Sequence, residues 1–117
     1  MFRKKSTEGK NYLELVPLRH YEHEVEADGN ISVLVPRFTN KFLVKHLSPR
    51  LKSPYVKARF DEFGSNVWLN IDGEKNVHSI SVILLNRFGE KIEPVNQRLT
   101  KFLTQLYTYN FIKFKDI

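Results

Sequence analysis

The fold is decided by residues 60–88, F-D-E-F-G-S-N-V-W-L-N-I-D-G-E-K-N-V-H-S-I-S-V-I-L-L-N-R-F. The apolar spacing at the start of this stretch predicts a short helix over 61–70, which holds the only tryptophan of the chain. The Asp-Gly pair at 72–73 is typical of a tight turn. Asn76 is placed to cap a second helix, which we expect to end at Gly89. Two helices joined by a turn therefore form the centre of the chain.

A third helix follows over 94–107, with Pro94 at its first position. In all three helices the apolar residues repeat at intervals of three and four, which is typical of helices that bury one face. Residues 110–114 alternate and predict a short closing strand or an extended cover over the core. The expected core residues are Phe63, Val67, Trp68 and Ile71 with the first helix, Val77, Ile80, Ile83, Leu84 and Phe88 in the second, and Val95, Leu99, Phe102, Leu103 and Leu106 in the third.

Three strands are expected before the helices. Residues 18–36 have the pattern of a hairpin, with residues that tolerate positive φ in the turn at 27–30. The second arm, 31–35, is β-branched and apolar, and Pro36 ends it. Residues 13–17 either begin a strand or lie over the core. The third strand, 55–60, alternates, with Val56, Ala58 and Phe60 facing the core and Tyr55, Lys57 and Arg59 facing outward.

The chain has 117 residues, of which 41% are hydrophobic, and we expect it to form one domain over 1–117. Residues 1–12 are polar and charged and predict a loose N-terminus. Residues 37–54 predict a long, basic and partly helical insertion between the second and third strands. The sequence therefore predicts an α+β domain, in which a three-stranded antiparallel sheet is followed by a three-helix bundle.

The positive charge is concentrated in the first half of the chain. The net charge is +6, and residues 1–60 hold 12 Lys and Arg against 6 Asp and Glu. Within 37–60 there are seven basic residues and no acidic one. Such a block favours an acidic partner, although a solubilising loop has the same pattern.

Several classes of function lack their usual signals. The chain has no cysteine, which removes disulfides, thiolate metal sites and cysteine nucleophiles. The histidines are not spaced as metal ligands, and no serine lies in a nucleophile motif. No apolar run is long enough to cross a membrane, and no signal peptide is evident. We therefore expect a cytoplasmic, non-membrane protein that is not an enzyme and binds no metal or cofactor.

Two kinds of binding fit the predicted elements. The second and third helices resemble a helix-turn-helix, in which the last helix would enter the major groove of DNA. The C-terminal half has no net charge, however, and this disfavours nucleic acid. Alternatively, if the strand 55–60 has a free edge, it would accept an extended peptide as an added strand, and its basic face would prefer an acidic one. A strand that is internal to the sheet, or capped by the loop, has the same sequence pattern.

The chain also resembles the PqqD family, over about residues 19–114. This family comprises small proteins of pyrroloquinoline quinone (PQQ) biosynthesis and the related recognition elements of ribosomal peptide modification systems (RiPP recognition elements). The strands 31–36 and 55–60 match the second and third strands of the family. The matching motifs are F-D-E-F-G-S-N-V-W at 60–68, I-D-G-E-K-N-V at 71–77, R-F-G-E at 87–90, I-E-P at 92–94, R-L at 98–99 and F-L at 102–103.

The resemblance implies a winged-helix-like fold and a peptide chaperone without catalytic activity. A leader peptide of a precursor would add beside the third strand, in a groove shared with the third helix. The protein would present this peptide to a modifying enzyme, often a radical SAM enzyme. The predicted peptide-binding residues are Tyr55, Lys57, Arg59, Arg98, Lys101, Phe102 and Gln105.

One segment departs from the family pattern. The second and third strands of the family are joined by a very short turn, whereas residues 37–54 intervene here. This insertion either extends the groove, blocks it or forms a homodimer contact. In the last case the chain is a protein-interaction domain without a peptide substrate.

Overall fold

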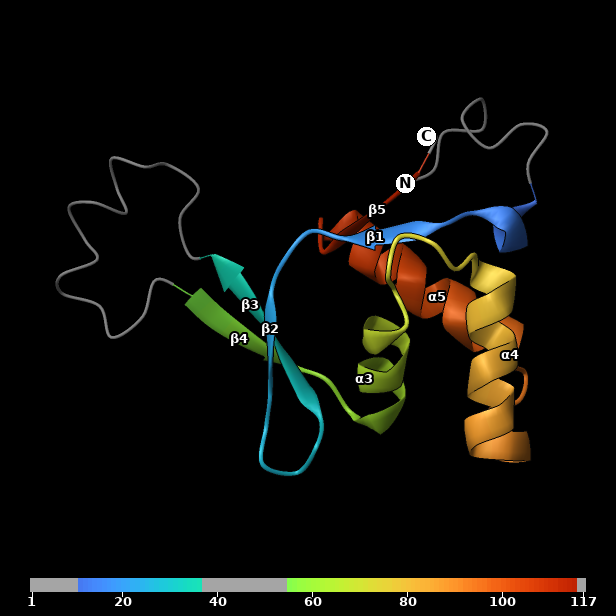
Figure 1. Ribbon diagram of the computed structural model, residues 1–117, viewed down its shortest axis with the longest axis horizontal. Helices are drawn as coiled ribbons and strands as arrows, with labels where there is room; N and C mark the ends of the chain where they lie inside the picture. The colour runs from blue at the N-terminus through green and yellow to red at the C-terminus, as the bar shows by residue number, and fades with distance from the viewer. Residues whose placement is uncertain (1–10, 37–54, 116–117) are drawn as a thin grey trace, which may run out of the picture. The chain divides into compact units, whose positions relative to one another are not determined.

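The computed structural model describes residues 11–36 and 55–115 (Figure 1). The chain divides into two units, which are described separately. The helical unit comprises residues up to 20 and from 63 onward, and the sheet unit comprises residues 21–62. The basic insertion at 37–54 and most of the predicted loose terminus lie outside the described residues. Of that terminus, Asn11 and Tyr12 are described, and Asn11 caps a short 3-10 helix that Tyr12 begins.

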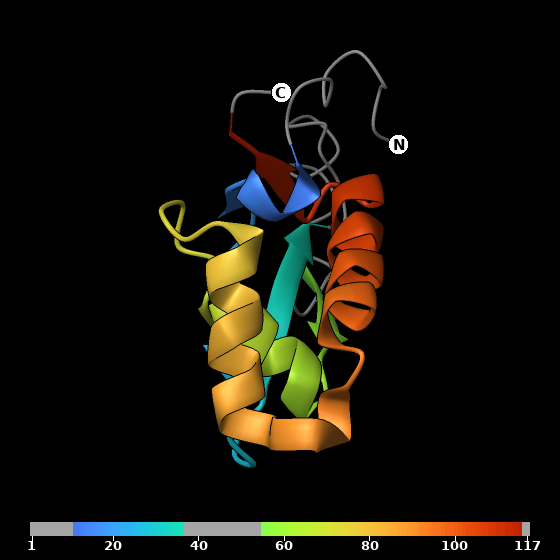
Figure 2. The same ribbon diagram turned by 90° about the vertical axis from the view of Figure 1, so that its right-hand side faces the viewer.

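The helical unit contains the three predicted helices. Its elements are η1 (Tyr12–Glu14), β1 (Pro17–Arg19), α3 (Glu62–Leu69), α4 (Val77–Phe88), η3 (Gly89–Ile92), α5 (Val95–Thr108) and β5 (Ile112–Phe114). The short helix η3 joins α4 and α5 at one end (Figure 2). Within the described ranges, no helix combines the length and the apolar character needed to cross a membrane.

The ends of α4 follow from the residues that flank it. The Asn76 side chain accepts a hydrogen bond of 2.8 Å from the backbone N–H of Ser79, which confirms the predicted cap. Gly89 ends the helix with a φ of 69°, in the region that favours glycine. The start of α5 was predicted one residue early, because Pro94 has extended backbone angles and caps the helix from outside.

The core of the helical unit is largely the predicted one. The side chains of Phe63, Ile83, Phe88 and Phe102 are only half-buried. The predicted residues that are buried are Val67, Trp68, Ile71, Val77, Ile80, Leu84, Val95, Leu99, Leu103 and Leu106. Leu15, Ile92, Ile112 and Phe114 are buried as well.

A two-stranded antiparallel sheet joins the two ends of the helical unit. Strand β1 pairs with β5, and Pro17 lies opposite Phe114. The closing strand predicted at 110–114 is therefore confirmed as β5. The first arm of the predicted hairpin is corrected, because residues 17–25 form two strands that belong to different sheets. Local alternation could not reveal this division, which depends on a partner almost a hundred residues away.

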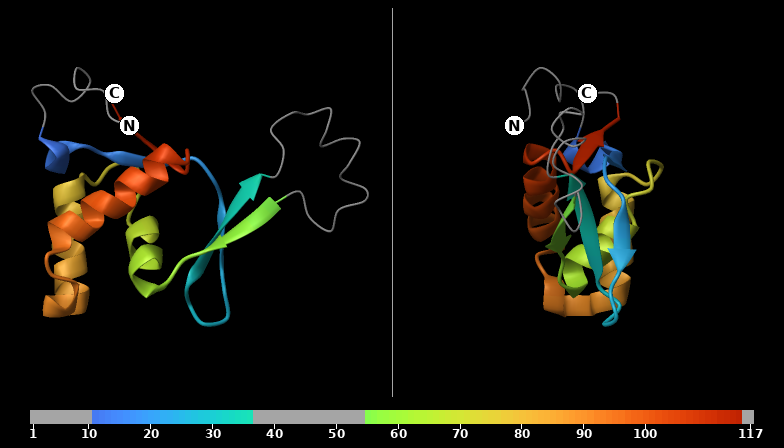
Figure 3. Two further views of the ribbon diagram at one scale, coloured as in Figure 1. Left: turned by 180° about the vertical axis from the view of Figure 1, so that it is seen from behind. Right: turned by 90° about the vertical axis from the view of Figure 1, so that its left-hand side faces the viewer.

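The sheet unit is a three-stranded antiparallel sheet in the order β2-β3-β4 (Figure 3). Its strands are β2 (His23–Val25), β3 (Ile31–Pro36) and β4 (Tyr55–Arg59). Gly29 has a φ of 88° in the turn between β2 and β3, as the hairpin predicted. The α+β class, with a three-stranded antiparallel sheet and three helices, is confirmed.

Candidate functional site

Strand β4 is the last strand of its sheet in the described part of the chain. The backbone N–H of Phe60 donates to the carbonyl of Ile31 on β3, at 3.0 Å. Backbone groups alternate in direction along an antiparallel strand, so those of Ala58 also face β3. The N–H and C=O groups of Lys57 and Arg59 consequently face the outer edge, where an added strand would bind.

The two faces of β4 differ from the prediction at one position. Val56 was expected to face the core, but it is 48% exposed. Ala58 and Phe60, on the same face, are half-buried. Since Val56 lies near the start of an edge strand, it has a described neighbouring strand on one side only. An apolar side chain is therefore accessible beside the outer edge of β4.

The basic side chains of β4 are paired with acidic residues of the same sheet. Lys57 Nζ lies 2.9 Å from Glu24 Oε1 and 3.8 Å from Glu26 Oε2. Arg59 Nη2 lies 3.9 Å from Glu26 Oε1. Hydrogen bonding and charge at Glu24, followed by the charge of Glu26, raise the pKa of Lys57. The outer face is therefore mixed in charge, rather than basic as the sequence of the strand predicted.

Glu26 is held in place from within the sheet. The buried Ser32 hydroxyl on β3 donates a hydrogen bond to Glu26 Oε2. This bond is the main cause that lowers the pKa of Glu26, and the nearby charges of Lys57 and Arg59 add to it. Glu26 therefore remains a carboxylate that faces both cations of β4.

Two of the predicted residues of α5 meet at an aromatic ring of α3. The guanidinium carbon of Arg98 lies 5.0 Å from the ring centre of Phe63, within the range of a cation–π contact. Arg98 Nη1 also donates to the carbonyl of Lys91, at 3.3 Å. The rings of Phe102 and Phe63 are 6.1 Å apart and nearly edge to face. Arg98 and Phe102 thus contribute to packing in the helical unit.

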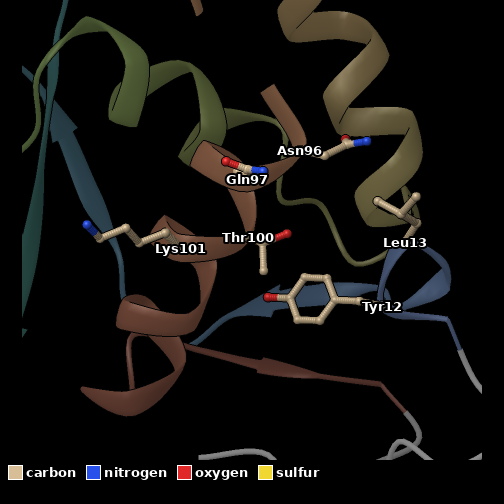
Figure 4. A pocket seen from close by; sticks show the side chains of 6 residues that line it. All are labelled: Tyr12, Leu13, Asn96, Gln97, Thr100 and Lys101. Atoms are coloured by element: carbon tan, nitrogen blue, oxygen red, sulfur yellow. The ribbon is translucent and has the colours of Figure 1, made fainter. Parts of the chain in front are cut away.

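The other two predicted residues of α5 lie apart from this cluster. Gln105 is exposed on the helix. Lys101 lines a hollow of about 430 Å³ between η1 and α5, together with Asn96, Gln97, Thr100, Tyr12 and Leu13. The close-up in Figure 4 shows the tyrosine ring on the η1 side and the lysine stem on the α5 side.

The hollow is mainly apolar, and one of its polar groups, the hydroxyl of Tyr12, is engaged by a neighbour. The hydroxyl of Tyr12 lies 3.5 Å from Thr104 Oγ1. Burial raises the pKa of this tyrosine, and the hydrogen bond with Thr104 opposes the shift. The ring also packs edge to face against Phe114, at 5.9 Å between centres. Tyr12 therefore anchors η1 to the helical unit.

The predicted site thus falls into two sets, each described within its own unit. Tyr55, Lys57 and Arg59 lie on β4 of the sheet unit, and Tyr55 is 43% exposed. The remaining four lie on α5 of the helical unit.

Sequence reasoning missed Glu24, Glu26 and Phe63 as partners of the basic residues. Counting the register from the turn at 27–30 would have placed Glu24 opposite Ser32, whereas the pairing of Ser32 with Arg59 had no local signal. The contact of Phe63 with Arg98 had no such signal, because it depends on how α3 packs against α5.

No group of three or more metal-ligating side chains occurs in the two ranges that the structure describes. Comparisons with protein-family models, with curated proteins and with solved structures found no match.

Proposed function

We propose that this protein is a non-catalytic adaptor that binds an extended peptide as an added strand along the outer edge of β4. The observation that carries the proposal is the outward direction of the backbone groups of Lys57 and Arg59. A strand edge of this kind gives affinity through main-chain hydrogen bonds, and the flanking side chains give specificity.

The surroundings of the edge support the same proposal. Lys57 and Arg59 keep long charged side chains on the face beside the edge, and Val56 is exposed on the other face. Charged side chains on an edge strand also discourage uncontrolled pairing with other sheets. The side chains beside the edge therefore support binding of a specific peptide and disfavour pairing with the strands of other proteins.

The nature of the peptide is proposed from the resemblance to the PqqD family. The added strand would be the leader of a ribosomally made precursor, and the protein would present it to a modifying enzyme such as a radical SAM enzyme. Under this proposal Arg98, Lys101, Phe102 and Gln105 on α5 form a second set of peptide contacts. The neighbouring genes offer a direct check, because a short precursor frame and a radical SAM enzyme are expected beside this one.

Strand addition is tested with a probe peptide of about ten residues, in which Thr alternates with Val and one central Thr is replaced by Glu. Two N-methylated versions carry methyl groups on alternate sets of amides. Only one set faces β4, so one version should lose binding in an NMR titration and the other should keep it. Equal binding of both versions would contradict strand addition.

A matched pair of protein variants tests the same edge. Lys57→Pro removes one outward N–H, which the sheet itself does not use, and Lys57→Gln removes the charge alone. We expect the proline variant to bind the probe peptide much more weakly than the glutamine variant. Circular dichroism and thermal unfolding of both variants verify that the sheet remains folded.

Nucleic-acid binding by α4 and α5 is the alternative. Its support is weakened because Arg98, one of the two cations on α5, is engaged by Phe63 and by the carbonyl of Lys91. Titration with a DNA duplex at low salt tests this alternative, because binding through phosphate contacts is tightest at low salt and weakens steeply as the salt concentration rises.

A further inference from the structure

The two cations of β4 differ in how far their charges are already satisfied. Lys57 Nζ forms a hydrogen-bonded ion pair of 2.9 Å with Glu24, and Glu26 lies nearby. An ammonium group is a compact donor, and here two carboxylates share it. A further acidic group approaching Lys57 would have to compete with both of them.

Arg59 is engaged much less. Its side chain is 76% exposed, and its one ion pair with the described residues is the 3.9 Å approach of Nη2 to Glu26, which is too long for a hydrogen bond. A guanidinium carries five N–H donors in a rigid fork that matches a carboxylate. In the part of the chain that the structure describes, most of this donor capacity has no acceptor.

The geometry points to Arg59, and not Lys57, as the residue that selects the charge of the bound peptide. This inference rests on the proposed strand addition at β4. An added strand places one residue directly opposite Arg59, with its side chain on the same face of the sheet. We infer that this residue is Asp or Glu, whose carboxylate takes the open donors of the guanidinium.

The other face of the sheet defines the neighbours of that acidic residue. Successive side chains of a strand point to opposite faces, so the residues on either side lie on the face of Val56 and Ala58. They lie opposite Ala58 and Phe60, which are apolar and half-buried. Val56, which is 48% exposed on this face, lies opposite the residue three positions from the acidic one and would be covered by a further apolar side chain. The substrate class is consequently an extended peptide in which an acidic residue is flanked on both sides by apolar ones, and this pattern is the same in either strand direction.

Glu26 is the carboxylate with which an acidic peptide residue would compete for Arg59. Its side chain is 21% exposed, and the Ser32 hydroxyl holds one of its oxygens, so the other oxygen stays directed toward Arg59. Because Glu26 follows β2, on the far side of β3 from the outer edge, it draws the guanidinium across the sheet and away from that edge.

The test compares the probe peptide carrying its central Glu with the same peptide carrying Gln, on the wild-type chain, on Arg59→Gln and on Lys57→Gln. Dissociation constants come from the NMR titration at low salt. We expect the wild type to prefer the Glu peptide by about three- to fivefold, as for a partly exposed ion pair. Arg59→Gln should abolish the preference, and Lys57→Gln should retain it. Glu26→Gln should increase the preference, because the guanidinium then lacks a competing carboxylate, and a decrease would show that Glu26 instead holds Arg59 in place for the peptide.

The outcomes separate this inference from the function on which it rests. If both peptides bind equally and shift the amides of Lys57 and Arg59, strand addition stands and the role of Arg59 is overturned. If Lys57→Gln, and not Arg59→Gln, removes the preference, the assignment to Arg59 is also wrong. If neither peptide shifts those amides at millimolar concentration, the proposed function fails and the inference fails with it.

Discussion

Lys57 Nζ lies 2.9 Å from Glu24 Oε1, although β3 separates the two strands that carry these residues. The pair therefore spans the whole width of the described sheet. This ion pair neutralises the charge of Lys57, which the sequence of β4 predicted to attract an acidic partner. The same relationship leaves Arg59 as the more available cation of the strand.

Lys57→Gln should lower the thermal unfolding midpoint only slightly. Both side chains of the pair are about half exposed, so the attraction is weak and is screened by salt. We expect the difference from the wild type to vanish in about 1 M NaCl, where the Debye length is short. Lys101→Gln on α5 is the control for loss of charge, since Lys101 forms no ion pair with the residues that the structure describes. An equal decrease at low and high salt would contradict this account.

Ser32→Ala should raise the pKa of Glu26 toward its ordinary value, because the serine hydroxyl is the main cause of the lowered pKa. A carboxyl with a lowered pKa stabilises the fold above the pKa of the unfolded chain, and this contribution is lost as pH falls through the folded pKa. The variant should therefore lose less stability on acidification than the wild type. A carboxyl-carbon NMR titration measures the pKa, and an unchanged value would exclude the hydrogen bond as its cause.

Gly73→Ala should destabilise the protein more than Gly29→Ala. Both glycines have positive φ, and a left-handed backbone costs a residue with a side chain about 1–2 kcal/mol. At Gly73 an added Cβ would also lie 2.5 Å from Leu18 Cδ2, whereas nothing lies within 4 Å at Gly29. Denaturant unfolding of both variants gives the comparison. Equal losses would show that the Leu18 side chain shifts without cost.

Phe63→Leu should destabilise the helical unit by about 1–2 kcal/mol, because it removes two aromatic contacts and the cation–π contact with Arg98. A double-mutant cycle with Arg98→Gln isolates the last of these. We expect coupling of about 0.5–1 kcal/mol, as for an exposed cation–π pair. If the two losses are simply additive, Arg98 is available for other contacts, including a peptide.

The helices were predictable because their signals are local. The cap at Asn76, the terminator Gly89 and the apolar repeats placed α4 correctly, and they placed α5 within one residue. Burial of Trp68 and Leu99 followed from the same repeats.

What could not be predicted depends on pairing between distant residues. The division of residues 17–25 into two strands depends on β5 near the other end of the chain. The neutralisation of Lys57 depends on the register of β4 against β3, and the exposure of Val56 depends on β4 being an edge. The strand 55–60 was therefore predicted correctly as an element, but the charge of its outer face was misjudged.

The central claim is that β4 accepts an added strand at the outward backbone groups of Lys57 and Arg59. Amide hydrogen exchange tests it most directly, because the amide of Ala58 faces β3 and serves as an internal control. In the free protein we expect slow exchange at Ala58 and fast exchange at Lys57 and Arg59. Saturating probe peptide should slow exchange at Lys57 and Arg59 and leave Ala58 nearly unchanged. Fast exchange at both residues in the bound state would contradict the claim.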